Sequence, residues 1–274
     1  MPVFAAEPTF LGIARSSWPA IIAPIVIGIL ALVGWEAIVR WNNIPYYILP
    51  GPMLVGRTLL EDWGTLSGAL LITVQITVMA LLAAVVLGVA LAVLFTQSKW
   101  LEMSLFPYAV VLQVTPIVAI APLIIIWAND TTLALLICAW IVAFFPILSN
   151  TILGLNSVDH NLINLFQMYG ASRWQTLRYL RLPAALPYFL GGLKISGGLS
   201  LIGAVVAEFV AGTGGSASGL ASRILESSYQ LKIPRMFAAL LLITMTGIAI
   251  FLLTSWLSNL LLRRWHESAV KREN

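Results

Sequence analysis

Charged residues are scarce in this chain of 274 residues: Asp, Glu, Lys and Arg make up 9% of it, whereas hydrophobic residues make up 60%. Soluble domains carry about 25% charged residues. A chain this poor in charge has too little polar surface for a water-soluble globule, so the composition excludes that class and indicates a membrane protein. The ten Trp fit this setting, because Trp gathers at membrane–water interfaces.

Cysteine and histidine are nearly absent. The single cysteine, Cys138, lies within an apolar run and excludes a disulfide framework. His160 and His266 lie far apart without metal-ligand spacing, and neither an HExxH nor a GxSxG motif occurs. These absences predict no metal site, no cofactor and no catalytic residue in this chain, and they leave a membrane enzyme with little support.

A nucleotide-binding loop is also missing. The glycine-rich run 212–219 has no Lys-Ser/Thr pair, and Gly-x4-Gly-Lys-Ser/Thr occurs nowhere in the chain. We interpret 212–219 as a turn in an outer loop. The net charge is +4, but the basic residues are scattered over many loops, which argues against a nucleic-acid partner.

Long apolar runs dominate what is present. A bilayer core needs about 20 apolar residues per helix, whereas strands of a membrane barrel would alternate in segments of about ten. The chain is therefore predicted to be an all-α, polytopic membrane protein with about six transmembrane helices, of which the first is retained and is no signal peptide. The predicted spans are 19–39, 68–96, 103–128, 131–153, 187–211 and 236–262.

Lys and Arg placement predicts the orientation, because basic residues are enriched in cytoplasmic loops. With the N-terminus inside, the inner side collects Arg15, Lys99, Arg173, Arg178, Arg181, Arg263, Arg264, Lys271 and Arg272, and the outer side collects Arg40, Arg57, Arg223, Lys232 and Arg235. We therefore expect an N-in, C-in topology, with a cytoplasmic N-terminus over 1–18 and a cytoplasmic basic tail over 263–274. Residues 40–65 are expected to form an outer loop with a short interfacial helix within 53–64.

Charges inside the apolar runs are costly and need an explanation. Glu36 precedes Arg40 by four residues, which suits an ion pair near the outer end of the first span. Lys194 and Glu208 lie fourteen residues apart in the fifth span, about 21 Å along a helix, so they cannot pair with each other. Lys194 either lines a translocation path or extends to the inner interface, and Glu208 either lines the path or ties the span to the outer loops.

The third span has polar residues and prolines at mid-depth. Gln113 and Thr115 precede Pro116, and Pro122 follows one and a half turns later. Each proline leaves a carbonyl without its helical partner, and such broken helices often surround a transport path. We predict that Gln113, Thr115 and Pro116 line a path; the alternative is a proline kink within a packed bundle.

A polar, basic segment over 154–187 separates the fourth and fifth spans. It predicts a short helix, a break at Gly170, a second short helix and a stop at Leu182-Pro183. Ser172 and Gln175 have the spacing of a capping box for the second helix. Such an elbow is an exposed segment to which a soluble partner could bind. Its first helix has an apolar surface that suits helix-in-groove binding, formed by Leu165, Phe166, Met168 and Tyr169. A helix lying on the membrane surface is the alternative.

The elbow resembles the cytoplasmic loop of permease subunits of bacterial ABC importers, whose pattern is Glu-Ala-Ala, three residues, Gly, nine residues and Ile-x-Leu-Pro. Gly170, Leu180, Leu182 and Pro183 match this pattern, whereas Asn164, Leu165 and Phe166 replace Glu-Ala-Ala. Other segments are similar to the nitrate, sulfonate, taurine and pyrimidine-precursor branch of the family, although Ala128-Asn129 stands where that branch has Phe-Gly. These segments are Leu49-Pro-Gly-Pro52, Pro116 and Pro122, Phe144-Phe-Pro-Ile147, Gly192-Leu-Lys194 and Ala207-Glu208.

The resemblance implies the type I ABC importer permease (MetI-like) fold over 66–262. It implies a permease subunit in the bacterial inner membrane that moves a small solute delivered by an extracytoplasmic binding protein. ATP and Mg would bind to separate ATPase subunits, and a second permease copy would complete the path. Docking of the ATPase would involve Asn164, Leu165, Phe166, Gly170, Ala171, Ser172, Leu180, Leu182 and Pro183.

Two questions stay open from the sequence. A secondary transporter with its own energy coupling is the alternative transporter class, although Glu208 alone is thin support for it. No motif identifies the substrate. The residues of the third span, 113–122, favour a pyrimidine-like heteroaromatic, while sulfonates and nitrate remain alternatives.

Overall fold

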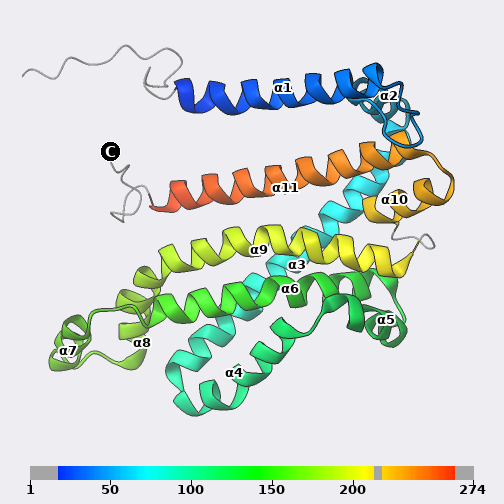
Figure 1. The fold of residues 1–274 in the computed structure, drawn as a ribbon. Coiled ribbons are helices and arrows are strands. Elements are labelled where there is room, and N and C mark those ends of the chain that lie inside the picture. The colour runs from blue at the N-terminus through cyan, green and yellow to red at the C-terminus, as the bar shows by residue number, and fades with distance from the viewer. Residues whose placement is uncertain (1–17, 213–217, 263–274) are drawn as a thin grey trace, which may run out of the picture.

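The computed structural model describes residues 18–212 and 218–262, and all regular structure in these residues is helical, as predicted. Figure 1 shows the helices as a layer of long rods with short helices at both ends. In chain order the elements are α1 (Trp18–Trp41), α2 (Pro52–Glu61), α3 (Trp63–Gln97), α4 (Lys99–Val114), α5 (Ile117–Ala128), α6 (Thr131–Leu155), α7 (His160–Met168), α8 (Arg173–Thr176), the π-helical turn η2 (Leu177–Arg181), α9 (Leu182–Ala211), α10 (Leu220–Tyr229) and α11 (Ile233–Leu262).

The spanning helices agree with the predicted number of about six. Five helical stretches are long and apolar enough to cross a bilayer, and α4 with α5 forms a sixth candidate that bends by 103° at its break. The five stretches are Ile22–Trp41, Trp63–Gln97, Thr131–Leu155, Arg173–Ala211 and Ile233–Leu262. Trp18, where α1 begins, and Leu262, where α11 ends, lie at the same end of the layer as the elbow (Figure 1).

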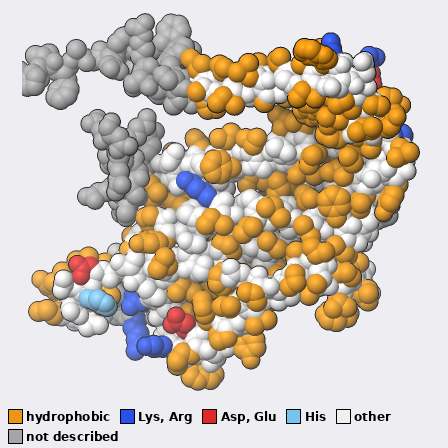
Figure 2. Space-filling model, viewed as in Figure 1, with side chains coloured by type: hydrophobic (Ala, Val, Ile, Leu, Met, Phe, Trp, Pro, Cys, Tyr) orange, Lys and Arg blue, Asp and Glu red, His pale blue; other side chains and the backbone are white. Residues whose placement is uncertain are grey.

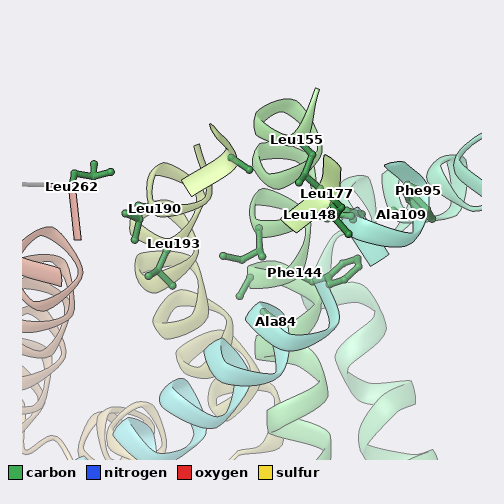
Figure 3. Packing of buried hydrophobic residues seen from close by; sticks show 14 residues of the cluster. Ala84, Phe95, Ala109, Phe144, Leu148, Leu155, Leu177, Leu190, Leu193 and Leu262 are labelled. Atoms are coloured by element: carbon green, nitrogen blue, oxygen red, sulfur yellow. The ribbon is translucent and has the colours of Figure 1, made fainter. Parts of the chain in front are cut away.

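The core of the bundle lies where α6 packs between α3 and α9. Phe144 and Leu148 of α6, Ala84 of α3 and Leu190 of α9 belong to one buried cluster (Figure 3). Small residues allow the backbones to approach, as is common between membrane helices. A Cβ built on Gly192 would lie 2.7 Å from the Pro146 carbonyl oxygen, so any side chain there would separate α9 from α6.

The first span lies apart from this core. Side chains of α1 are largely exposed from Ile22 onward, and Figure 1 shows α1 at the edge of the layer, joined to it through α2. The predicted pair of Glu36 and Arg40 is confirmed, with 2.6 Å between Oε1 and Nε. Glu36 also accepts a hydrogen bond from the Met53 backbone N–H at 3.2 Å. The helix expected within 53–64 is α2, and its place at the membrane interface stays a prediction.

Candidate functional site

The elbow begins as its sequence predicts. Asp159 caps α7 by accepting a hydrogen bond from the Asn161 backbone N–H, and Gly170 then has φ 70°, the left-handed conformation that glycine adopts without strain. The capping box is confirmed: the Ser172 N–H donates to Gln175 Oε1 at 2.7 Å, and the Gln175 N–H donates to Ser172 Oγ at 3.3 Å. Local sequence rules therefore fix the sharp turn between α7 and α8.

The predicted stop at Leu182-Pro183 is wrong. Helix α8 continues through η2 directly into α9, and Pro183 lies in the first turn of α9. A π turn shifts the hydrogen-bond ladder by one residue, so the missing N–H of Pro183 falls where a new ladder begins and the helix need not end. The helix of the fifth span consequently begins before residue 187, and the second half of the elbow is continuous with α9.

The elbow is anchored at its two ends and at Leu177, whereas α7 is exposed. Leu177 is buried and belongs to the same cluster as Leu155 at the end of α6. No residue of α7 is buried, and the helix projects beyond the ends of α6 and α9 (Figure 1). Leu165 and the neighbouring Met168 and Tyr169 are exposed, with 85% of Met168 and 84% of Tyr169 accessible. No sequence pattern indicated that Leu177 is buried, whereas the apolar surface of α7 is present as predicted.

The residues predicted for ATPase docking lie along this single elbow. Asn164, Leu165 and Phe166 lie on α7; Gly170, Ala171 and Ser172 form the turn; and Leu180, Leu182 and Pro183 follow in η2 and at the start of α9. Asn164 is exposed, so a polar side chain stands on the outer surface of α7. Helix α7 is short, exposed and held by the turn that leads into α8 and α9. Such a helix can insert into a groove of a partner.

The third span is broken where the prolines predict. Helix α4 ends at Val114, α5 begins at Ile117, and the two meet at 103°. Thr115 Oγ1 donates to the Val111 carbonyl oxygen at 2.6 Å, and the same oxygen accepts the Thr115 N–H at 3.1 Å, so both donors of Thr115 bind back to the last turn of α4. Gln113 is exposed on this surface. The break therefore carries an exposed polar side chain at the position of the predicted path.

The two charges of the fifth span lie in different surroundings. Lys194 is half-buried, and within the described residues it forms no ion pair. Glu208 is fully buried near the opposite end of α9. Its Oε1 accepts a hydrogen bond from Thr73 Oγ1 at 2.7 Å, and its Oε2 accepts one from the Ala221 N–H at 2.9 Å. This geometry favours a tie to the outer loop over a place in the path.

The network around Glu208 joins three helices. Thr73 of α3 accepts a hydrogen bond from the Leu220 N–H at 2.9 Å, so the first two amides of α10 are both satisfied by side chains of other helices. A Cβ at Gly219 would overlap the Glu208 carboxylate. Only glycine therefore fits where α10 meets this network.

A second tie joins Asp62, the residue between α2 and α3, to Arg235 of α11. Arg235 binds Asp62 through two hydrogen bonds, from Nε at 2.6 Å and from a terminal guanidinium nitrogen at 2.8 Å. The Arg235 guanidinium holds the pKa of the Asp62 carboxyl below its usual value. We call Glu208, Thr73, Asp62 and Arg235, together with α10, the cap. In the described part of the chain, no three His, Cys, Asp or Glu residues are placed to hold a metal ion.

Known proteins resemble the whole of this arrangement. Residues 84–267 match the family described as binding-protein-dependent transport system inner membrane component. The chain is 35% identical to the riboflavin transport system permease protein RibX of Chloroflexus aurantiacus, over 98% of each chain. It is 31% identical to the formylaminopyrimidine transport permease protein ThiX of Halalkalibacterium halodurans, over 87% of this chain and 94% of the relative.

Other relatives are named as permeases for aliphatic sulfonates, taurine and nitrate. Among solved structures, an amino acid ABC transporter with histidines has the same fold, with a TM-score of 0.58 and 20% identity over 76% of this chain and 97% of that one. These relatives are transport subunits and no enzymes, and they give the secondary-transporter alternative no support. The chain thus belongs to the binding-protein-dependent inner membrane components and is the transmembrane permease subunit of an ABC importer, which works with an ATPase and a substrate-binding protein.

Proposed function

We propose that this permease imports a small heteroaromatic solute of the flavin or pyrimidine-precursor type. The observation that carries this proposal is the 35% identity to a riboflavin permease over 98% of both chains, which includes the first span and the cap. The formylaminopyrimidine permease, whose named substrate is also a nitrogen heterocycle, supports the same class. Sulfonate and nitrate are the competing classes.

The proposed assembly is a homodimer in the inner membrane with two ATPase subunits, and with both termini of each chain in the cytoplasm. One chain has too few spans to enclose a path, and two-fold pairing is the commonest way to complete one. The inner position of the termini is supported by the Lys and Arg distribution and by the common end that Trp18, Leu262 and the elbow share. In this arrangement α7 inserts its apolar residues into a groove of the ATPase.

In the proposed dimer the broken span lines the path. The exposed Gln113 and the half-buried Thr115 stand where the helix breaks, and irregular backbone at membrane depth is tolerated next to protein or a wet cavity. Gln113→Cys and Thr115→Cys, each in a Cys138→Ser background, should react with a small water-soluble thiol reagent. The reactivity should change when nucleotide traps the ATPase. Inert cysteines in every state of a transporting complex would assign the path to other spans.

Uptake by the reconstituted complex tests the substrate. The permease is purified with its ATPase and binding protein, placed in liposomes and supplied with ATP. Riboflavin, formylaminopyrimidine, taurine and nitrate are offered in turn. We expect ATP-dependent uptake of one of the two heterocycles and none of taurine or nitrate. Uptake of taurine or nitrate alone would overturn the proposed substrate class and leave the importer family unchanged.

A further inference from the structure

A basic hollow lies between the elbow and the turn that joins α3 to α4. Its volume is about 350 Å³, and it opens beside α8. Seven of its lining side chains carry hydrogen-bond donors: Thr96, Gln97, Lys99, Gln167, Arg173, Thr176 and Arg181. Figure 2 shows Lys and Arg side chains gathered between α8 and the start of α4. The hollow therefore has the chemistry of an anion site.

Three cations line the hollow. Within the described residues, Lys99, Arg173 and Arg181 form no ion pair; the four ion pairs found there involve other arginines. Glu102 follows in the first turn of α4, but it does not line the hollow. Three like charges around one small space repel one another, so an anion with several acceptor oxygens would stabilise the arrangement.

Two tryptophans place the hollow at the level of lipid headgroups. Trp100 follows Lys99 directly, Trp174 follows Arg173 directly, and both are largely exposed. Exposed Trp in a membrane protein is enriched at the interface between acyl chains and water. Basic pockets between membrane helices on the cytoplasmic side bind anionic headgroups.

We propose that this hollow binds the phosphate group of an anionic lipid of the inner leaflet. Guanidinium groups of Arg173 and Arg181 and the ammonium group of Lys99 supply the charge, and the side-chain amides of Gln97 and Gln167 supply further donors. The leaflet follows from the topology under "Proposed function", but binding of the lipid depends neither on the substrate nor on transport.

The site and the docking surface occupy different faces of α7. Ile163 and Gln167 lie one turn apart and line the hollow. Leu165 and Met168 project from the other side of the helix, because successive residues turn by about 100°. A lipid can therefore stay bound while the ATPase holds the apolar face, and it would brace the elbow against α3 and α4.

The test measures phosphatidylglycerol bound to the permease–ATPase complex, by native mass spectrometry and by titration with a fluorescent phosphatidylglycerol in phosphatidylcholine nanodiscs. Arg181→Gln should weaken binding roughly fivefold and Lys99→Gln with Arg181→Gln roughly 25-fold, since each basic residue near a membrane surface contributes a similar factor. Arg181→Lys should restore most of the affinity. Arg178→Gln is the matched control: Arg178 lies in the same turn, is exposed and stacks on Tyr179 outside the hollow, and its loss should leave affinity unchanged.

Four results would overturn the proposal. Equal affinity in wild type and the Lys99/Arg181 variant, with both folded by their melting temperatures, would exclude the hollow. An equal loss in Arg178→Gln would mean that surface charge alone attracts the lipid. Inorganic phosphate or glycerol phosphate that competes as well as the lipid would make the hollow a site for free anions. Loss of ATPase association from the Lys99/Arg181 variant in phosphatidylcholine alone would assign the hollow to an acidic side chain of the ATPase.

Discussion

The two ends of this permease differ in how their polar groups are paired. At the cap, Glu208, Thr73 and the first amides of α10 satisfy one another, and Asp62 pairs with Arg235. At the elbow, α7 has no buried residue, and neither Arg173 nor Arg181 has an acidic partner in the described part of the chain. These polar groups of the cap pair within one chain, although the buried Nε of Arg223 in α10 has no hydrogen-bond partner among the described residues. The elbow, by contrast, is an open surface for other molecules.

This difference fits a subunit that receives energy at one end. A surface that must dock and release an ATPase needs apolar side chains and charges that remain exposed until the partner arrives. At the cap, by contrast, the polar groups of α9 and α3 need partners within the chain, because unpaired polar groups near the membrane are costly. We expect substitutions at the cap to reduce stability and substitutions at the elbow to reduce transport.

Glu208→Ala should have the largest effect on stability. It leaves the buried hydroxyl of Thr73 and the Ala221 amide without their acceptor and opens a cavity, which should cost about 2–4 kcal/mol. The measurement is the melting temperature of the purified complex in detergent. Glu208→Gln keeps the shape and one acceptor, so it should cost less than half as much. An unchanged melting temperature for Glu208→Ala would remove the basis for a closed cap.

Gly170→Val should have the largest effect on transport. The native φ of 70° is strained for a β-branched residue, so the elbow must change its turn. We expect uptake to fall about tenfold or more, equivalent to at least about 1.4 kcal/mol of coupling, while the melting temperature of the permease stays near wild type. Gly170→Asn is the control, because Asn tolerates the left-handed conformation.

The opposite pattern for Gly170→Val would count against the comparison. If uptake and association with the ATPase both remain at wild-type levels, the turn is not needed for docking. If the melting temperature falls as far as in Glu208→Ala, the elbow is part of the structural core and is no open surface.

Asp62→Asn should cost about 1–2 kcal/mol at neutral pH, because it removes the charge that binds Arg235. The pKa of Asp62 is lowered in the folded protein, so its contribution is fully present above the unfolded pKa of about 3.9 and is lost as pH falls through the lower folded pKa. Melting curves of wild type and variant should therefore converge below about pH 4. A difference that persists unchanged at the lowest pH would mean that the ion pair is not its source.

Arg57→Ala should have the smallest effect, within about 0.5 kcal/mol. Arg57 pairs with Glu61 on α2 at 2.8 Å, but both side chains are more than half exposed. The same melting measurement checks this, with Asp62→Asn as the reference. A loss as large as that of Asp62→Asn would show that exposure does not separate the two pairs.

Local patterns predicted much of the fold. Run lengths predicted about six spans, Pro116 predicted the break in the third, and Ser172 with Gln175 predicted the capping box. These features depend on residues within a few positions of one another. The stop at Pro183 was predicted wrongly. The preceding π turn places Pro183 in the first turn of α9, where its missing N–H does not end the helix.

Long-range partners could not be predicted. Thr73 and Glu208 lie 135 residues apart, and Asp62 and Arg235 lie 173 apart, so no local spacing reveals either pair. From the sequence, Glu208 could either line the translocation path or tie the fifth span to the outer loop. Only the packing of α3, α9 and α10 favours the tie. Leu177 is similar: nothing in its neighbourhood marks it as the buried side chain of η2.

Hydrogen–deuterium exchange of the permease, with and without its ATPase, tests the contrast between the two ends most directly. We expect amides of 160–172 to exchange rapidly in the permease alone and to become protected when the ATPase binds. Amides of 220–229 should be protected in both states, because their first donors already bind Thr73 and Glu208. Protection of 160–172 before the ATPase is added, or ATPase-dependent protection confined to 220–229, would contradict it.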